Sequence, residues 1–213
     1  MTRRELKLNY NEYCLQVCLD MQVGLGGDKW PAADLFCHLI TSNQWIPKFT
    51  SIFDHKTVLD LGSGTGITGI LLDKVYNTKE IIITDLESHI EHIKYNILLN
   101  QEDRKVTTAC ALDWFQPKTS VDKKIDIILA FECVYKESLY EPFINTLDEL
   151  SHSKSLIFLG MTRNFMKPSF FKLLRQHGYM YTLVPQDNMP NEYRSNGSLR
   201  DTGLLICSKC NNN

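Results

Sequence analysis

Short apolar runs alternate with longer segments of helical spacing from residue 57 onwards. Apolar runs of a few residues are typical of buried strands, and the segments between them are long enough to form helices. We expect strands near residues 57–61, 80–84, 106–111, 125–131, 155–161, 180–184 and 203–208, and helices near residues 67–76, 87–99, 138–150 and 168–177. This alternation predicts an α/β fold whose mostly parallel sheet is covered by helices on both faces.

The last two predicted strands differ from the others because no helix lies between them. Only the stretch from Pro185 to Asp201 connects them, so we expect these strands to pair antiparallel. Gly178 stands at the end of the preceding helix, where a left-handed residue is needed. The sheet is therefore expected to contain seven strands and to end in an antiparallel strand.

Residues 13–21 alternate strictly between two sets of side chains, which predicts a half-buried strand. The set expected to face the core is Tyr13, Leu15, Val17, Leu19 and Met21, and the outer set is Cys14, Gln16, Cys18 and Asp20. Residues 5–10 are a candidate hairpin partner for this strand. Pro31 suits the first position of a helix over residues 32–41.

Composition is ordinary for a globular protein, with 43% hydrophobic and 23% charged residues. The length predicts one domain over residues 1–213, with an N-terminal extension at residues 1–50 and a seven-strand core at residues 51–213. A net charge of −2 provides no field for holding nucleic acid. No apolar run approaches the roughly 20 residues that span a bilayer, and the first residues lack the apolar segment of a signal peptide. We therefore expect no nucleic-acid or membrane partner, with a monomer as the default state.

Seven cysteines are scattered along the chain, as in proteins whose thiols stay reduced, so we expect a cytoplasmic or nuclear location. Cys207 and Cys210 form a single Cys-x-x-Cys pair. A structural zinc site would need a second pair or suitably spaced histidines, and none is evident in the sequence. The expectation is therefore that no metal is bound, with metal or redox use of this pair as the alternative.

A glycine-rich turn at residues 62–66, Gly-Ser-Gly-Thr-Gly, follows the first strand of the alternating region and precedes a predicted helix. Glycines allow positive φ and let a ligand approach the backbone closely. The free N–H groups in the first turn of the next helix add hydrogen-bond donors and a favourable dipole. Strand, turn and helix together predict a site for a nucleotide-like cofactor.

Two cofactor classes compete for this turn. Gly64-x-Gly66-x-x-Gly69 matches the dinucleotide fingerprint, although a lone match is weak evidence. Counted from Asp60, the pattern apolar-Asp-apolar-Gly-x-Gly-x-Gly is similar to that of class I S-adenosylmethionine methyltransferases. A carboxylate at this position suits a cofactor that carries an ammonium and a sulfonium. An ordinary strand-to-helix turn is the third interpretation.

Two further positions are candidates for binding a nucleoside. Asp85 ends the second strand, where a carboxylate can accept hydrogen bonds from both hydroxyls of a ribose or, alternatively, cap the next helix. Trp114 follows the third strand and can stack against an adenine, while Asp113 can accept from its exocyclic amine. Packing in the loop is the alternative for Trp114, and spacing alone places Trp30 in the core.

The stretch Phe131 to Tyr135 follows the fourth strand, and ligands of open α/β sheets sit at the carboxyl ends of strands where the strand order reverses. Methyl transfer requires a nucleophile that is aligned, freed of water and uncharged. A lysine amine, with a pKa of about 10.4, is protonated at neutral pH. Glu132 and Tyr135 could hold such an amine by hydrogen bonds and direct its lone pair. Capping by Glu132 and packing by Tyr135 are the alternatives.

These features together resemble the METTL21-type, seven-β-strand protein-lysine methyltransferases, which have the class I methyltransferase (Rossmann-like) fold. The resemblance covers about residues 13–208 and rests on Trp30 and on residues 59–66, 84–87, 112–114 and 132–142. The family motif Asp-x-x-Tyr is here Glu132-x-x-Tyr135, which is one methylene longer and keeps the charge.

The resemblance implies which residues contact S-adenosylmethionine and which act on the acceptor. The implied cofactor-binding residues, with Asp60 beside them, are Trp30, Gly62, Ser63, Gly64, Asp85, Trp114 and the backbone around Phe131. Trp30 thereby changes from a core residue to a lid over the cofactor. Glu132 and Tyr135 are the implied catalytic pair, and Glu192 to Ser195 would lie at the rim near the protein substrate.

The favoured function is therefore an S-adenosylmethionine-dependent protein-lysine N-methyltransferase. Members of the family act on chaperones, elongation factors and an AAA ATPase, and the member acting on the AAA ATPase is the most similar around residues 132–151. The expected partner is thus a protein that carries the acceptor lysine. Methylation of arginine, histidine or a small molecule is one alternative, and a binding module without catalysis is another. A chain of 213 residues scarcely leaves room for the substrate domain of an NAD-dependent enzyme.

Overall fold

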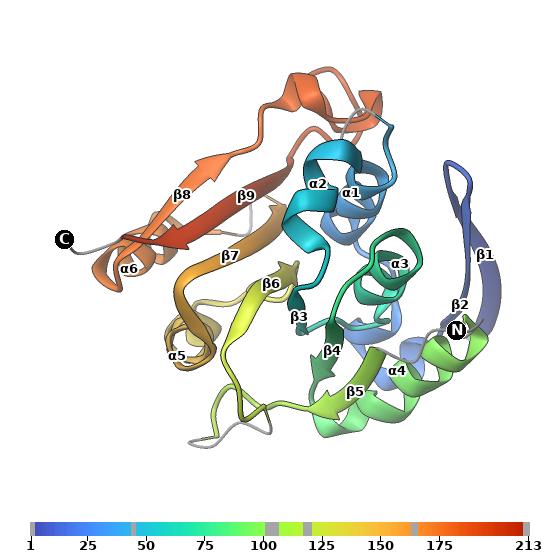
Figure 1. Ribbon diagram of the computed structural model, residues 1–213, viewed down its shortest axis with the longest axis horizontal. Coiled ribbons are helices and arrows are strands. Elements are labelled where there is room, and N and C mark those ends of the chain that lie inside the picture. Colours follow the sequence, from blue (N-terminus) through green and yellow to red (C-terminus); the bar gives the residue numbers. More distant parts are fainter. Residues whose placement is uncertain (1–2, 44–45, 101–106, 117–120, 163–165, 211–213) are drawn as a thin grey trace.

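The computed structural model describes residues 3–43, 46–100, 107–116, 121–162 and 166–210. A seven-stranded sheet with the order β5-β4-β3-β6-β7-β9-β8 lies at its centre (Figure 1). The strands are β3 (Thr57–Leu61), β4 (Glu80–Asp85), β5 (Thr107–Ala111), β6 (Ile125–Phe131), β7 (Ser151–Thr162), β8 (Tyr179–Leu183) and β9 (Thr202–Lys209). Neighbouring strands in the part β5-β4-β3-β6-β7 of the sheet are parallel. Strand β9 is antiparallel to both of its neighbours, β7 and β8. This is the class I methyltransferase fold, as predicted.

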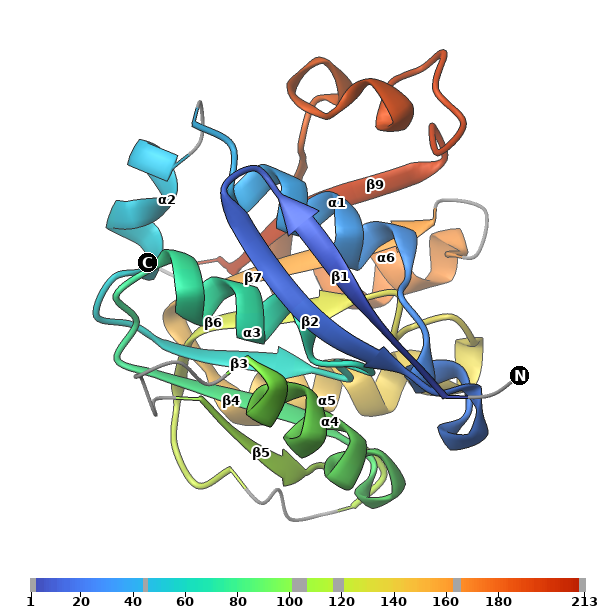
Figure 2. The ribbon, with the colours of Figure 1, turned by 90° about the vertical axis from the view of Figure 1, so that its right-hand side faces the viewer.

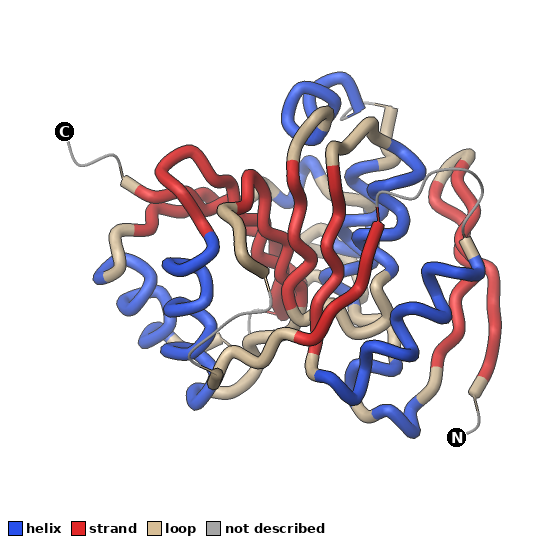
Figure 3. Tube along the Cα trace, turned by 60° about the horizontal axis from the view of Figure 1, so that its bottom comes forward, coloured by secondary structure: helices blue, strands red, loops and turns tan. Residues whose placement is uncertain are grey.

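Helices cover both faces of this sheet (Figures 1 and 3). On one face lie α1 (Pro31–Ile40), α2 (Ile46–Phe53), α3 (Ile67–Val75) and α4 (Glu87–Leu99), and on the other lie α5 (Tyr140–Leu150) and α6 (Pro168–Gln176). The central strands are buried on both sides, so neighbouring residues enter different cores. Val58 packs in the core beneath α1, α3 and α4, and Leu59 packs in the core beneath α5 and α6. Within the described residues, no helix is both long and apolar enough to cross a membrane.

The predicted N-terminal hairpin forms a separate two-stranded antiparallel sheet of β1 (Arg4–Tyr10) and β2 (Tyr13–Leu19). It lies across α3 and α4, as Figure 2 shows. Asn96 of α4 fixes it there: its Oδ1 accepts from the backbone N of Cys18 at 2.8 Å, and its Nδ2 donates to the carbonyl of Thr65 in the glycine turn at 2.9 Å. The hairpin is thus joined to the loop expected to bind the cofactor.

Some details of the N-terminal region differ from the prediction. Cys18, expected on the outer face, is fully buried because the end of β2 packs against α4. Met21, expected in the core, is 42% exposed because the strand ends at Leu19 and a 3₁₀ helix, Met21–Val23, follows. Helix α2 was not predicted, whereas α1 begins at Pro31 as expected. The helix before Gly178 ends there with φ of +79°, also as predicted.

Candidate active site

A cavity of about 740 Å³ opens where β3, β4 and β6 end. The neighbouring positions of β3 and β6 in the sheet create this crevice, because the chain leaves β3 toward one face and β6 toward the other. All ten predicted site residues line it: Trp30, Asp60, Gly62, Ser63, Gly64, Asp85, Trp114, Phe131, Glu132 and Tyr135. The structure thus brings the whole predicted set together, while the role of each residue remains a prediction.

The glycine turn forms the floor of the cavity. Gly62 and Gly64 have φ of +67° and +62°, a conformation that favours glycine. A Cβ atom at Gly62 would lie 2.8 Å from Cβ of Cys133, so a side chain there would clash. Ser63 Oγ is buried and has no hydrogen-bond partner among the described residues. Bare backbone and an unpaired hydroxyl are features of a loop that accepts a polar ligand.

Asp60 at the end of β3 is buried and ties this strand to the helix after the glycine turn. Its Oδ2 accepts hydrogen bonds from the Thr68 hydroxyl and, at 3.0 Å, from the backbone N of Gly69. Burial outweighs these bonds and raises the pKa of Asp60 to about 6. A cation placed in the cavity would stabilise the ionised form.

We expect the variant Asp60→Asn to change how stability depends on pH. The pKa of Asp60 is about 6 in the folded protein and 3.8 for an ordinary aspartate, which represents the unfolded chain. The folded protein therefore binds this proton more tightly than the unfolded chain does. The associated stability is present at low pH and is lost as pH rises through about 4 to 6. The asparagine variant lacks this loss, so its free energy of unfolding relative to the parent should rise by up to about 3 kcal/mol. Urea unfolding of both proteins at about pH 4.5 and about pH 7 measures this; an unchanged difference would contradict it.

Asp85 joins the end of β4 to the glycine turn. Its Oδ2 accepts from the backbone N of Gly64, and its Oδ1 accepts from the backbone N of Leu86, both at 2.8 Å. The residue that caps α4 is Leu86, so the alternative that Asp85 is the N-cap is wrong. His89 Nδ1 lies 3.5 Å from Oδ1 and forms a side wall of the cavity.

Two tryptophans form walls of the cavity. Trp114 packs edge-on against Phe143 with ring centroids 5.2 Å apart, and its ring is close to Gly62. Trp30 is 36% exposed, so the interpretation as a core residue is wrong. The indole of Trp30 donates to the carbonyl of Leu25 at 2.9 Å, which places the ring at the cavity mouth.

Asp113, proposed to accept from an adenine amine, is already engaged within its own loop. Its Oδ1 accepts from the backbone N of Phe115 at 3.0 Å, and its Oδ2 accepts from the side chain of Gln116 at 3.2 Å. Carboxylate oxygens have two lone pairs each, so these bonds leave capacity for a further donor.

Glu132 has φ of +55°, which is uncommon for a residue with a side chain. Its Oε1 accepts from the Thr162 hydroxyl at 2.7 Å and from the backbone N of Ala32 at 3.3 Å. Burial outweighs these bonds and raises the pKa of the carboxyl. Glu132 therefore contacts the N-terminus of α1, and the alternative that it caps the next helix is wrong. Tyr135 is 42% exposed at the cavity mouth, so packing does not explain its position.

Sequence reasoning missed the segment that covers the glycine turn. Residues 23–26 line the cavity, and the backbone of Gly26 lies so close to the turn that a Cβ at Gly64 would be 2.9 Å from the Gly26 carbonyl oxygen. The three glycines at positions 24, 26 and 27 were the available signal, but they were interpreted only as a break in the chain. Glu192 to Ser195 do not line the cavity, and Tyr193 is fully buried, so it is not a rim residue.

Comparison with known proteins identifies the family to which this chain is similar. A model described as lysine methyltransferase matches residues 9–177. EEF1A lysine methyltransferase 3 of Xenopus tropicalis is 27% identical over 81% of this chain and 68% of its own. Protein-lysine N-methyltransferase EFM6 of Saccharomyces cerevisiae is 31% identical over 65% of this chain and 63% of its own. Calmodulin-lysine N-methyltransferase of Arabidopsis thaliana is 25% identical over 73% of this chain and 52% of its own. The chain thus spans about two thirds or less of the length of most of these relatives.

Solved structures share the fold at low identity. The 16S rRNA N2 G1207 methyltransferase RsmC of T. thermophilus, in complex with AdoMet and guanosine, matches with a TM-score of 0.65 and 15% identity over 99% of this chain and 51% of that one. The N-methyltransferase NodS of Bradyrhizobium japonicum, in complex with S-adenosyl-L-homocysteine, matches with a TM-score of 0.57 and 14% identity over 78% of this chain and 83% of that one. These likenesses concern the fold, whereas the family model covers most of the sequence. The chain therefore belongs to the lysine methyltransferase family.

Proposed function

We propose that this protein is an S-adenosylmethionine-dependent protein-lysine N-methyltransferase. The observation that carries the proposal is the convergence of three elements on one cavity: the glycine turn, the carboxylate of Asp85, and the pair Glu132 and Tyr135. Membership of the lysine methyltransferase family supports the choice of lysine over other acceptors.

The residues present fit this cofactor. The Ser63 hydroxyl, which has no partner in the described part of the chain, and the side-chain-free surface of Gly62 and Gly64 suit a polar ligand held against backbone. Asp85 would accept from the ribose hydroxyls, and Asp60 would lie toward the cationic end. Trp114 would flank the adenine, with the backbone around Phe131 beside it and Trp30 as the lid. Bound here, S-adenosylmethionine supplies a methyl group on a positively charged sulfur.

The chain's own contribution to the reaction centres on Glu132. A lysine ammonium entering the cavity would give one proton to this carboxylate, and the neutral amine, held by its remaining N–H groups against Glu132 and the phenol oxygen of Tyr135, would then have its lone pair directed toward the methyl group. The same burial that raises the pKa of Glu132 makes its carboxylate a better acceptor for the ammonium proton. The apolar lining excludes water from the amine once it is uncharged.

Thr162 is expected to matter for turnover through its hydrogen bond to Glu132. Thr162→Val removes the hydroxyl that donates to Oε1 at 2.7 Å and leaves the carboxylate free to turn away from the acceptor amine, so methyl transfer should be about tenfold slower through lost positioning. Affinity for the cofactor should stay within about twofold, because Thr162 does not line the main cavity. Thr162→Ser keeps the hydroxyl and is the matched control. Single-turnover rates that are equal for the parent and the valine variant would contradict this role.

The proposed function is tested by incubating the purified protein with methyl-labelled S-adenosylmethionine and candidate acceptors. Purified EEF1A and calmodulin are tested because relatives of this chain are named as their lysine methyltransferases. An AAA ATPase is tested because of the sequence resemblance around residues 132–151, and cell lysate is included to reveal other acceptors. Label on a lysine, mapped by mass spectrometry and absent with Glu132→Ala, is the expected result. Label on arginine, histidine or a small molecule would show that lysine is not the acceptor. Failure to bind the cofactor would overturn the proposal as a whole.

A further inference from the structure

We propose that Asp34 is a positioning residue for cofactor binding, because its ion pair with Lys29 holds the lid segment, residues 20–30, over the cavity. The inference rests on the proposed function, since it concerns the same cavity. Neither Asp34 nor Lys29 is among the predicted site residues. Neither belongs to a motif that the sequence analysis linked to a binding site.

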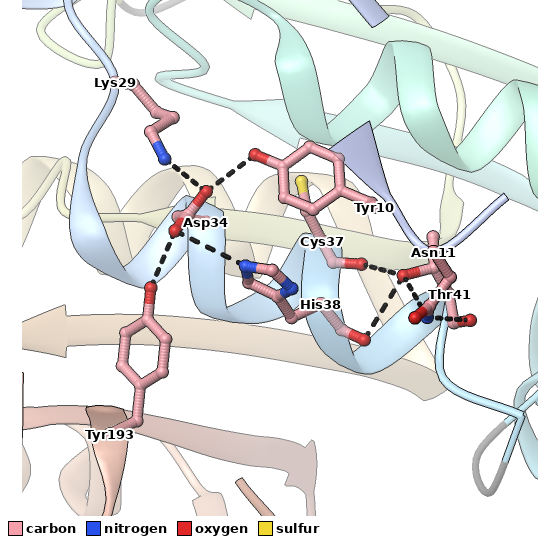
Figure 4. A network of polar contacts seen from close by, with 8 residues as sticks. All are labelled: Tyr10, Asn11, Lys29, Asp34, Cys37, His38, Thr41 and Tyr193. Atoms are coloured by element: carbon pink, nitrogen blue, oxygen red, sulfur yellow. Dashed lines mark hydrogen bonds and ion pairs between the residues drawn. The ribbon is translucent and has the colours of Figure 1, made fainter. Parts of the chain in front are cut away.

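Asp34 lies in the first turn of α1, and its carboxylate accepts hydrogen bonds from three other segments of the chain (Figure 4). Its Oδ1 accepts from the hydroxyl of Tyr10 in β1 at 2.7 Å and from Nζ of Lys29 at 2.5 Å. Its Oδ2 accepts at 2.8 Å from the hydroxyl of Tyr193, in the 3₁₀ helix Asn191–Tyr193.

The surroundings of Asp34 favour the ionised form of its carboxylate. Burial alone would raise its pKa, but the hydrogen bonds from Lys29 and Tyr10 outweigh burial and lower it. The first turn of a helix also favours negative charge. With side chains only 14% and 30% exposed, Asp34 and Lys29 form a partly buried pair that is less screened than one on the open surface.

Lys29 is directly connected to the part of the chain that covers the cavity. The next residue, Trp30, is the N-cap of α1, and its indole holds the carbonyl of Leu25 at 2.9 Å. The loop is closed farther back by a hydrogen bond of 2.9 Å from the backbone N of Asp20 to the carbonyl of Gly27. Gly26 between them rests on the glycine turn. Movement of Lys29 away from Asp34 would therefore shift both Trp30 and the backbone above the cofactor site.

The lid segment is packed so closely that it cannot move independently of the residues beneath it. A Cβ atom at Gly26 would lie 2.5 Å from the ring of His89, and one at Gly27 would lie 1.8 Å from the carbonyl oxygen of Asp20. Such close packing transmits displacement instead of absorbing it. The Lys29–Asp34 pair is thus placed to set the height of the lid above the glycine turn.

The test measures binding of S-adenosylhomocysteine, by titration calorimetry for affinity and by stopped flow for the dissociation rate. Lys29→Met and Asp34→Asn are expected to weaken binding about tenfold, mainly through faster dissociation as the lid opens. Lys29→Arg keeps the cation and should bind within about twofold of the parent. Tyr10→Phe is the matched control, because it removes another donor to the same oxygen from the hairpin side. It should lower thermal stability without changing affinity.

The outcomes separate the inference from the proposed function. No binding by the parent protein would overturn the proposed function and the inference with it. Binding by the parent together with unchanged affinity and dissociation rate in Lys29→Met would overturn the inference alone. Equal loss of affinity in Tyr10→Phe and Lys29→Met would also overturn it, because the network would then act only on the stability of the fold.

Discussion

Replacing Glu132 with glutamine is expected to slow methyl transfer about 100-fold or more, with affinity for S-adenosylmethionine changed less than about threefold. Glutamine keeps the length of the side chain, so its carbonyl oxygen can still accept from Thr162 and from the backbone N of Ala32. It lacks the negative charge that we propose holds the acceptor ammonium and takes its proton. Single-turnover rates at saturating cofactor, with calorimetric affinities, separate the two quantities. A large loss of cofactor affinity would instead make Glu132 a cofactor ligand.

Glu132→Asp tests the departure from the family motif in the same assay. The shorter side chain withdraws the carboxylate by about 1.5 Å, one carbon–carbon bond. The hydrogen bonds to Oε1, now 2.7 and 3.3 Å long, would then lengthen unless the loop adjusts. We expect activity between that of the parent and that of the glutamine variant, because the charge remains. Activity no higher than that of Glu132→Gln would show that reach, in addition to charge, is required here.

Asp85→Ala is expected to weaken S-adenosylmethionine binding by about 1–3 kcal/mol, or about 5- to 150-fold. The substitution removes the proposed partner of the ribose and leaves the backbone N–H groups of Gly64 and Leu86 without their acceptor. The glycine turn thereby loses the bond that fixes its position relative to β4. Titration calorimetry measures the affinity, with thermal unfolding as a check on the fold.

The control for this variant is Asp113→Ala, which removes another carboxylate lining the same cavity. The bonds of Asp113 to Phe115 and Gln116 stay within one loop, so its removal does not disturb the glycine turn and costs at most one bond to the adenine; its loss of affinity should be smaller than that of Asp85→Ala. An unchanged dissociation constant in Asp85→Ala would remove Asp85 from the site. Equal losses in both variants would indicate a general electrostatic effect of the cavity.

The sheet was predictable because its strands are locally encoded. Runs such as residues 57–61 and 125–131 carry apolar residues on both faces with one carboxylate each, and the structure has strands with these same bounds. The turn chemistry of Gly178 was equally local, since a left-handed helix end requires no distant partner. Cys18 could not be placed correctly by alternation alone, because a contact with Asn96, far along the chain, buries it.

The candidate site was predictable as a set of residues but not as a set of contacts. Topology alone brings the ends of β3, β4 and β6 to one edge, so residues directly after these strands had to meet. The hydrogen bond between Ala32 and Glu132 joins positions 100 residues apart, and the one between Tyr193 and Asp34 joins positions 159 apart. No local pattern encodes such pairs, because each depends on how α1 packs over the finished sheet.

The left-handed backbone of Glu132 has a consequence for any attempt to improve this protein. Two features of this position oppose folding: a positive φ that costs a side-chain-bearing residue about 1 kcal/mol, and burial of a carboxylate whose pKa is raised. Glycine would relieve both at once and would also remove the proposed catalytic group. Directed evolution scored only on thermal resistance would therefore enrich inactive clones at this codon, so a selection has to include methyl transfer from its first round.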